Sequence, residues 1–175
     1  MLTRVGVRDH GVVNSDAVLA VAAGQGLGAV RSDRWPMVAA HLLAVGLDGA
    51  DLVALASLSA NASGWEIDQL VPGALAEMGA PELTVQAASD VYARLVAMAS
   101  WDRQEYPIVL TLARLAPELD YPDGVVSDAY YASEWVSCDC CADSQARADA
   151  DALEARLAAL PALDLPAGLV EALMG

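Results

Sequence analysis

Residues 84–101 read TVQAASDVYARLVAMASW, and their pattern decides the fold class. Thr84 is a typical helix-capping residue, and apolar residues follow it at intervals of three and four. They are Val85, Ala88, Val91, Tyr92, Leu95, Val96 and Met98. This spacing places them on one face of a helix, because an α-helix turns once in about 3.6 residues. A half-buried strand would need alternation of apolar and polar residues, and no sustained alternation occurs in the chain.

Similar patterns on both sides of this stretch predict an all-α fold. Residues 35–45 have apolar residues at helical spacing, and Ser63 with Glu66 forms a capping box, in which each side chain reaches the other residue's amide. Pro72 predicts a kink or a break in the helix that follows, because proline cannot donate a backbone hydrogen bond. We expect about eight helices in a single compact bundle that spans residues 1–175.

Three segments depart from the helical pattern. Residues 1–14 show no clear period and predict an irregular N-terminal arm. Residues 117–124 are rich in acids and turn-forming residues, and they mark a possible subdomain boundary. The glycines within residues 24–28 resemble a phosphate-binding loop, but they follow an Ala-rich helix and not a strand. We therefore interpret them as the end of a helix.

The composition predicts a folded protein of the cytoplasm. Of the 175 residues 56% are hydrophobic, and the mean hydropathy is +0.39, which excludes a disordered chain. Phe is absent, so Ala, Leu and Val must build the core. No apolar stretch reaches the ~20 residues that a membrane span requires. The N-terminus lacks the apolar segment of a signal peptide.

The charge is strongly and locally acidic. The formal net charge is −15, and all nine basic residues are Arg. Residues 117–154 contain ten acids against one base, Arg147, and so carry −9 of the total. Such a field repels nucleic acid and anionic membranes, and it attracts a basic partner. We predict a basic protein partner, without nucleic acid or membrane binding. An acidic surface that serves solubility alone is the alternative.

Aromatic residues within the acidic segment are candidate partner-binding residues. Tyr130, Tyr131 and Trp135 lie close to Asp128 and Glu134. Tyr131 and Trp135 share one helical face, and we expect the two carboxylates to point elsewhere. Rigid rings with carboxylates around them suit an interface that receives Arg or Lys. We therefore predict Asp128, Tyr131, Glu134 and Trp135 as the partner-binding residues. The alternative is that the rings fill a core poor in aromatics.

Three cysteines, Cys138, Cys140 and Cys141, lie within four residues. As thiolates they could bind zinc or copper, with His10 or His41 as a fourth ligand. Their spacing differs from that of structural zinc sites, and a second cysteine pair is absent. Cys138 and Cys141 have the C-x-x-C spacing of redox sites, without the βαβ context of such sites. We expect reduced thiols without a cofactor, and keep zinc or copper binding as the alternative.

Three parts of the chain carry a resemblance to a known group of proteins: residues 35–56, residues 65–77, and the Ala132–Trp135 sequence ASEW with the acidic helix after it. They resemble small acidic helical proteins, rich in Ala and Leu, of high-GC Gram-positive bacteria. The resemblance implies a helical fold and implies no catalytic residue. The Cys138–Cys141 cluster and the N-terminal arm are not part of it.

These observations favour a non-enzymatic, protein-binding helical domain. A concrete version is an immunity-type or antitoxin-like protein, whose acidic surface covers a basic active site of its partner. One alternative is a metal-binding or redox-active protein that uses the three cysteines. The other is an accessory subunit of a larger assembly.

Overall fold

The computed structural model describes residues 10–59, 62–99, 105–136 and 144–175. Of these residues 68% are helical and none lies in a strand, which confirms the all-α prediction. The described part of the chain has nine α-helices and one 3-10 turn, against about eight helices predicted. They are α1 (His10–Gly26), η1 (Ser32–Arg34), α2 (Trp35–Ala44), α3 (Ala50–Ser57), α4 (Gly64–Glu77), α5 (Val85–Met98), α6 (Pro107–Ala113), α7 (Val125–Val136), α8 (Ser144–Ala158) and α9 (Leu169–Met174). None of the described helices is long and apolar enough to cross a lipid bilayer.

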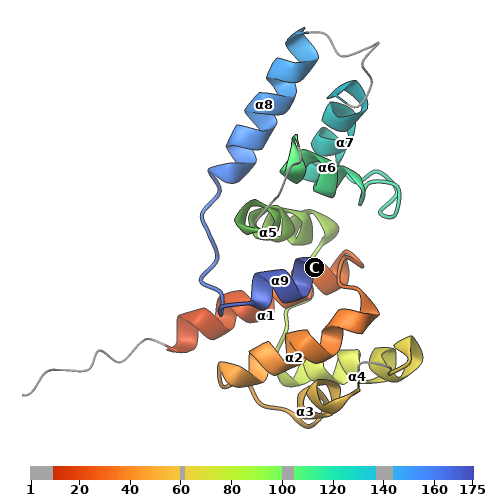
Figure 1. Ribbon diagram of the computed structural model, residues 1–175, viewed down its shortest axis with the longest axis vertical. Helices are drawn as coiled ribbons and strands as arrows, with labels where there is room; N and C mark the ends of the chain where they lie inside the picture. The colour runs from red at the N-terminus through yellow and green to blue at the C-terminus, as the bar shows by residue number, and fades with distance from the viewer. Residues whose placement is uncertain (1–9, 60–61, 100–104, 137–143) are drawn as a thin grey trace, which may run out of the picture.

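Helix α5 lies across the middle of the molecule (Figure 1). It packs on α1 and α9 on one side, and beyond them lie α2, α3 and α4. On its other side it packs on α6, α7 and α8. Buried apolar side chains from all nine helices form one continuous cluster. The 117–124 turn joins α6 and α7, which pack on each other, and a subdomain boundary there stays a prediction.

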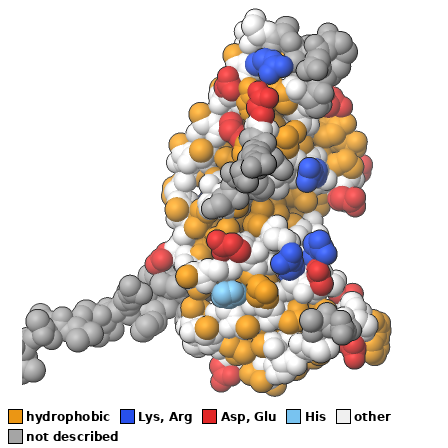
Figure 2. All heavy atoms as spheres, viewed as in Figure 1, with side chains coloured by type: hydrophobic (Ala, Val, Ile, Leu, Met, Phe, Trp, Pro, Cys, Tyr) orange, Lys and Arg blue, Asp and Glu red, His pale blue; other side chains and the backbone are white. Residues whose placement is uncertain are grey.

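The apolar stripe of α5 forms the centre of the core. Five of its seven predicted residues are buried, namely Ala88, Val91, Tyr92, Leu95 and Val96. Val85 is 41% exposed because it begins the helix, and Met98, its last residue, is partly buried. Small side chains dominate the cluster, so neighbouring helices approach closely. Figure 2 shows that many apolar side chains also reach the surface, between separate acidic and basic groups.

The helix starts follow the predicted capping chemistry. The Ser63 hydroxyl accepts a hydrogen bond from the Glu66 amide at 3.3 Å, and the Glu66 carboxylate accepts one from the Ser63 amide at 2.9 Å. These bonds hold the pKa of Glu66 below its ordinary value. The Thr84 hydroxyl accepts from the Ala87 amide at 3.2 Å and caps α5. These caps satisfy amides that have no partner inside their own helix.

The glycines at 24–28 form a helix end, as predicted. Gly28 has a φ of +64°, in the left-handed region that glycine adopts without strain. The Ala29 amide donates to the Gly24 carbonyl at 2.8 Å, which closes the last turn of α1. The start of α1 differs from the prediction, since residues 10–14 are helical and not irregular. Glycine and β-branched residues at 11–13 have low helix propensity and hide this turn in the sequence. Residues 1–9 lie outside the described residues.

Helix α4 runs unbroken through Pro72, so the predicted break into two pieces does not occur. Pro72 is exposed, as is Asp68, whose carbonyl loses its helical donor. Water can hydrate that carbonyl, and this lowers the cost of an interior proline.

Two helices are capped by carboxylates from distant parts of the chain. Glu77, at the end of α4, accepts from the amides of Ala50 and Asp51 at the start of α3, both at 3.0 Å. The second carboxylate is Glu154 of α8, which accepts from the amides of Ile108 and Val109 at the start of α6, also both at 3.0 Å.

A second hydrogen bond joins α8 to the start of α6. The hydroxyl of Tyr106, which precedes α6, hydrogen-bonds with Asp151 of α8 and thereby raises the pKa of Tyr106. Glu154 and Asp151 therefore fix α8 against the start of α6.

We expect Glu154→Ala to lower the free energy of unfolding by about 1–2 kcal/mol, because two part-buried amides lose their acceptor. Glu154→Gln keeps one acceptor oxygen and should lose less. Urea denaturation measures both changes. Glu118→Ala, at an exposed turn residue, is the control and should change the value by less than about 0.5 kcal/mol. Equal losses for Glu154→Ala and Glu118→Ala would contradict the capping role.

Candidate functional site

The four predicted partner-binding residues all belong to α7, and the structure describes the side chains of three of them. Asp128 and Tyr131 line a groove between α7 and α8. Glu134 instead hydrogen-bonds with Tyr130. The backbone of Trp135 is part of α7, and its side chain lies outside the described residues. The expectation that Asp128 points away from Tyr131 is wrong, because residues three apart on a helix are neighbours.

The groove, called the α7–α8 groove below, has a volume of about 540 Å³. This is within the range of about 300–1,000 Å³ that is usual for binding pockets. Eight residues line it, which are Asp128, Tyr131, Ala132, Ala146, Asp149, Ala152, Leu153 and Arg156. Three of them are alanines, and their short side chains leave the hollow between two helices that are otherwise in contact.

The residues from α8 were not predicted from the sequence. They follow one another at helical intervals, at positions 146, 149, 152, 153 and 156, and so form one stripe. Leu153 is the buried member of the stripe and packs in the core. Its burial turns Asp149 and Arg156 toward the groove beside it. This stripe is the signal in the sequence that could have identified them.

Two carboxylates lie at the rim of the groove. Asp128 pairs with Arg156 across the two helices, with 3.1 Å between Oδ2 and Nη2. Asp149 accepts a hydrogen bond from Gln145 Nε2 at 2.8 Å. A carboxylate has about four acceptor positions, so each can accept further bonds from a ligand. The groove therefore has the chemistry to bind a cation.

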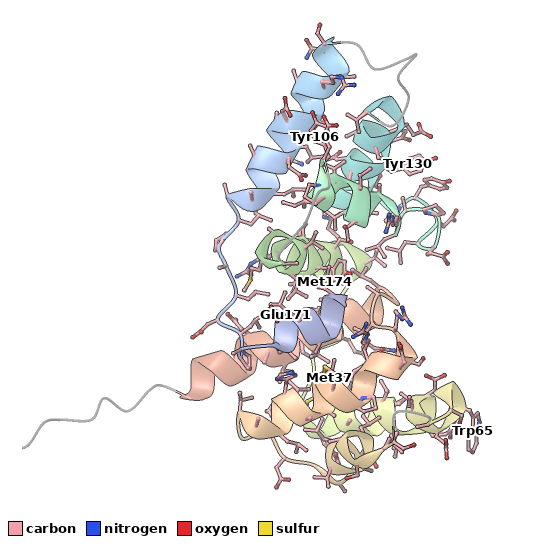
Figure 3. All side chains as sticks on the ribbon, in the orientation of Figure 1. Met37, Trp65, Tyr106, Tyr130, Glu171 and Met174 are labelled. Carbon is pink, nitrogen blue, oxygen red and sulfur yellow. The ribbon has the colours of Figure 1, made fainter. Side chains whose placement is uncertain are left out.

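Tyr131 presents an aromatic ring at this rim and is 58% exposed. Its ring packs edge-on against Tyr130, with 5.8 Å between centroids, and Tyr130 packs in the same way on Tyr121 at 5.0 Å. The row holds the exposed ring in place, which lowers the entropy that binding would cost. Figure 3 shows Tyr130 beside α7, near the loop that joins α6 and α7.

The loop end of this row is a strained turn. Asp120 and Tyr121 both have positive φ values, of +55° and +52°, which non-glycine residues rarely adopt. The Tyr121 amide donates to the Ala116 carbonyl at 2.8 Å, and its ring packs on Tyr130. These contacts offset the strain and bring Tyr121 to the row, although it is nine residues away in sequence.

Glu134 supports the row and does not line the groove. Its carboxylate accepts a hydrogen bond from the Tyr130 hydroxyl, and this bond is the largest cause of a raised pKa for Tyr130. A hydrogen bond with Tyr121 and burial raise the pKa of Tyr130 further. Glu134 is thus a positioning residue for the aromatic row.

The predicted metal ligands Cys138, Cys140 and Cys141 lie outside the described residues. Among the residues that the structure does describe, no group of three or more His, Cys, Asp and Glu side chains could hold a metal ion. Zinc or copper binding by the cysteines therefore stays a prediction. His41 is half-buried and packs on Gly168 at the start of α9.

Comparison of the chain with protein family models, with curated proteins and with solved structures finds no match. The fold and the site define an all-α protein with an acidic groove between two helices. Its function must be argued from the chemistry of that groove.

We expect Glu134→Gln to lower the pKa of Tyr130 toward the ordinary tyrosine value of about 10, because it weakens the hydrogen bond that holds the hydroxyl protonated and removes the carboxylate charge. The raised pKa stabilises the folded state below the unfolded value, and this stability is lost as the pH rises toward the folded value. Ring-carbon NMR resolves Tyr130 from the other tyrosines during the titration. An unchanged Tyr130 titration in Glu134→Gln would contradict the assignment.

Proposed function

We propose that this chain is a non-enzymatic, cytoplasmic protein-binding domain, and that its α7–α8 groove receives an arginine side chain of a basic protein partner. The observation that carries the proposal is the set of groups around the groove. Two carboxylates, Asp128 and Asp149, and the exposed ring of Tyr131 surround a hollow with alanines in its wall.

Each of these groups suits a guanidinium ion. Carboxylates accept paired hydrogen bonds from arginine, and such charge-assisted bonds are stronger than neutral ones. An aromatic face attracts a cation, and the planar guanidinium can stack on it. Arginine is also less strongly hydrated than lysine, so it loses less on entering a groove. The groove therefore favours arginine over lysine.

The overall charge supports the same kind of partner. With a net charge of −15, the protein attracts a basic surface over a long range and repels nucleic acid. Complementary charge raises the association rate and selects against wrong partners. An immunity-type or antitoxin-like protein would use this arrangement to cover the basic active site of its partner.

The proposal is tested with a blocked peptide, Gly-Arg-Gly-Arg-Gly, whose neutral counterpart has citrulline in place of arginine. We expect the arginine peptide to bind and the citrulline peptide to bind at least about fivefold more weakly. Affinity should fall steeply between about 0.01 M and about 0.15 M salt, because the screening length drops from about 30 Å to about 8 Å. Isothermal titration calorimetry measures each affinity.

A matched pair of variants separates the groove from the overall charge. Asp149→Asn removes a carboxylate at the groove, and Glu82→Gln removes one from an exposed loop. Both variants have the same net charge. We expect Asp149→Asn to weaken binding about three- to tenfold and Glu82→Gln to weaken it less than about twofold. Equal losses of affinity in the two variants would show that binding depends on the overall charge and not on the groove, and would contradict the proposal.

A further inference from the structure

We infer that Arg156 occupies the guanidinium site of the α7–α8 groove in the free protein, and that the arginine of a partner must displace it. This inference rests on the proposed function. It makes Arg156 a specificity-determining residue, which competes with every incoming cation for Asp128.

The ion pair across the groove carries the inference. The Arg156 guanidinium approaches Asp128 from the opposite helix, with 3.1 Å between Nη2 and Oδ2, and both residues line the groove. This is the contact that an arginine of a partner would make with Asp128. The chain therefore supplies, from its own α8, the chemical group that the groove is suited to bind.

The ion pair between Arg156 and Asp128 is exposed enough to break. The side chains of Arg156 and Asp128 are 60% and 53% exposed, and water and salt weaken such a pair. Arg94 differs, because its Nε donates to the Pro161 carbonyl at 2.7 Å and thereby joins α5 to the loop after α8. Of these two arginines, Arg156 is the one whose contact with the neighbouring helix is an exposed ion pair, so that moving its side chain costs less.

A second groove gives the displaced side chain a place to go. This groove, between α5 and α8, has a volume of about 490 Å³. Arg156 lines it as well, together with Leu157, Leu160 and Asp90. The apolar residues can cover the stem of Arg156, and Asp90 supplies another carboxylate for its guanidinium. Arg156 thus stands between two grooves, each with an acid.

Because Arg156 already occupies the guanidinium site, the groove is more selective for its partner. A partner must replace a guanidinium that already makes a charge-assisted bond, and a lysine ammonium has no planar pair of donors with which to do so. Simple cations are also excluded more strongly when Asp128 is already paired. Removing Arg156 should therefore raise affinity and reduce the preference for arginine over lysine.

The test compares Arg156→Gln with Arg147→Gln in binding of the peptide Gly-Arg-Gly-Arg-Gly. Both variants remove one positive charge from α8, but Arg147 pairs with Glu105 and does not line the groove. We expect Arg156→Gln to bind the arginine peptide about three- to fivefold more tightly than the wild type does. The affinity of Arg147→Gln should rise by less than about 1.5-fold. The gain should vanish when Asp128→Asn is added, because the contested carboxylate is then absent.

The outcomes separate the inference from the proposed function. If Arg156→Gln and Arg147→Gln raise the affinity for the peptide equally, the effect is one of net charge and the inference is overturned. The inference is also overturned if Arg156→Gln leaves the affinity unchanged while Asp149→Asn still weakens binding. If the wild-type chain does not prefer the arginine peptide to the citrulline peptide, the proposed function itself fails. Side-chain NMR of Arg156 adds a direct readout, since its Nε–H signal should shift when the peptide displaces it.

Discussion

The candidate site depends on one contact, in which the carboxylate of Glu154 accepts hydrogen bonds from the first amides of α6. It accepts from Ile108 and Val109 and places a negative charge at the positive end of a helix. Helix α8 is held further by the Tyr106–Asp151 hydrogen bond, by the Arg156–Asp128 ion pair and by three buried residues, Ala150, Leu153 and Leu157. The Glu154 cap and these contacts together set the register of α8 against α6 and α7. Without that register, the two halves of the α7–α8 groove would not face each other.

The groove follows from the same composition that builds the core. A chain without Phe packs its helices through Ala, Leu and Val, which allows close approach where the residues are buried. At the edge of the α7 and α8 contact, Ala132, Ala146 and Ala152 do not fill the space, and a hollow remains. The acidic residues beside it make the hollow attractive to cations. One composition thus gives both the packing and the binding chemistry.

Local features of the structure could be predicted from the sequence, and contacts between distant elements could not. The helices, and the caps at Ser63 and Thr84, depend on residues within four positions, so periodicity and capping rules identified them. The Glu154 cap joins residues 46 positions apart and leaves no local pattern. Asp128 and Tyr131 were named as candidates because they lie in one acidic, aromatic stretch, whereas Asp149 and Arg156 of α8 were missed. The helical stripe of α8 can be seen in the sequence, but its position beside α7 cannot. The role of Asp149 and Arg156 depends on how α8 lies on α7.

The most direct test of the central claim fills the groove without changing any charge. Ala152→Leu places a larger side chain in the wall of the groove, and Ala148→Leu makes the same change at an exposed position of α8 outside it. Leucine is nearly as good a helix former as alanine, so both variants should fold. Calorimetry should find that Ala152→Leu weakens binding of the arginine peptide at least about fivefold and that Ala148→Leu leaves it within about twofold. Wild-type affinity in Ala152→Leu would contradict the claim that the groove is the binding site.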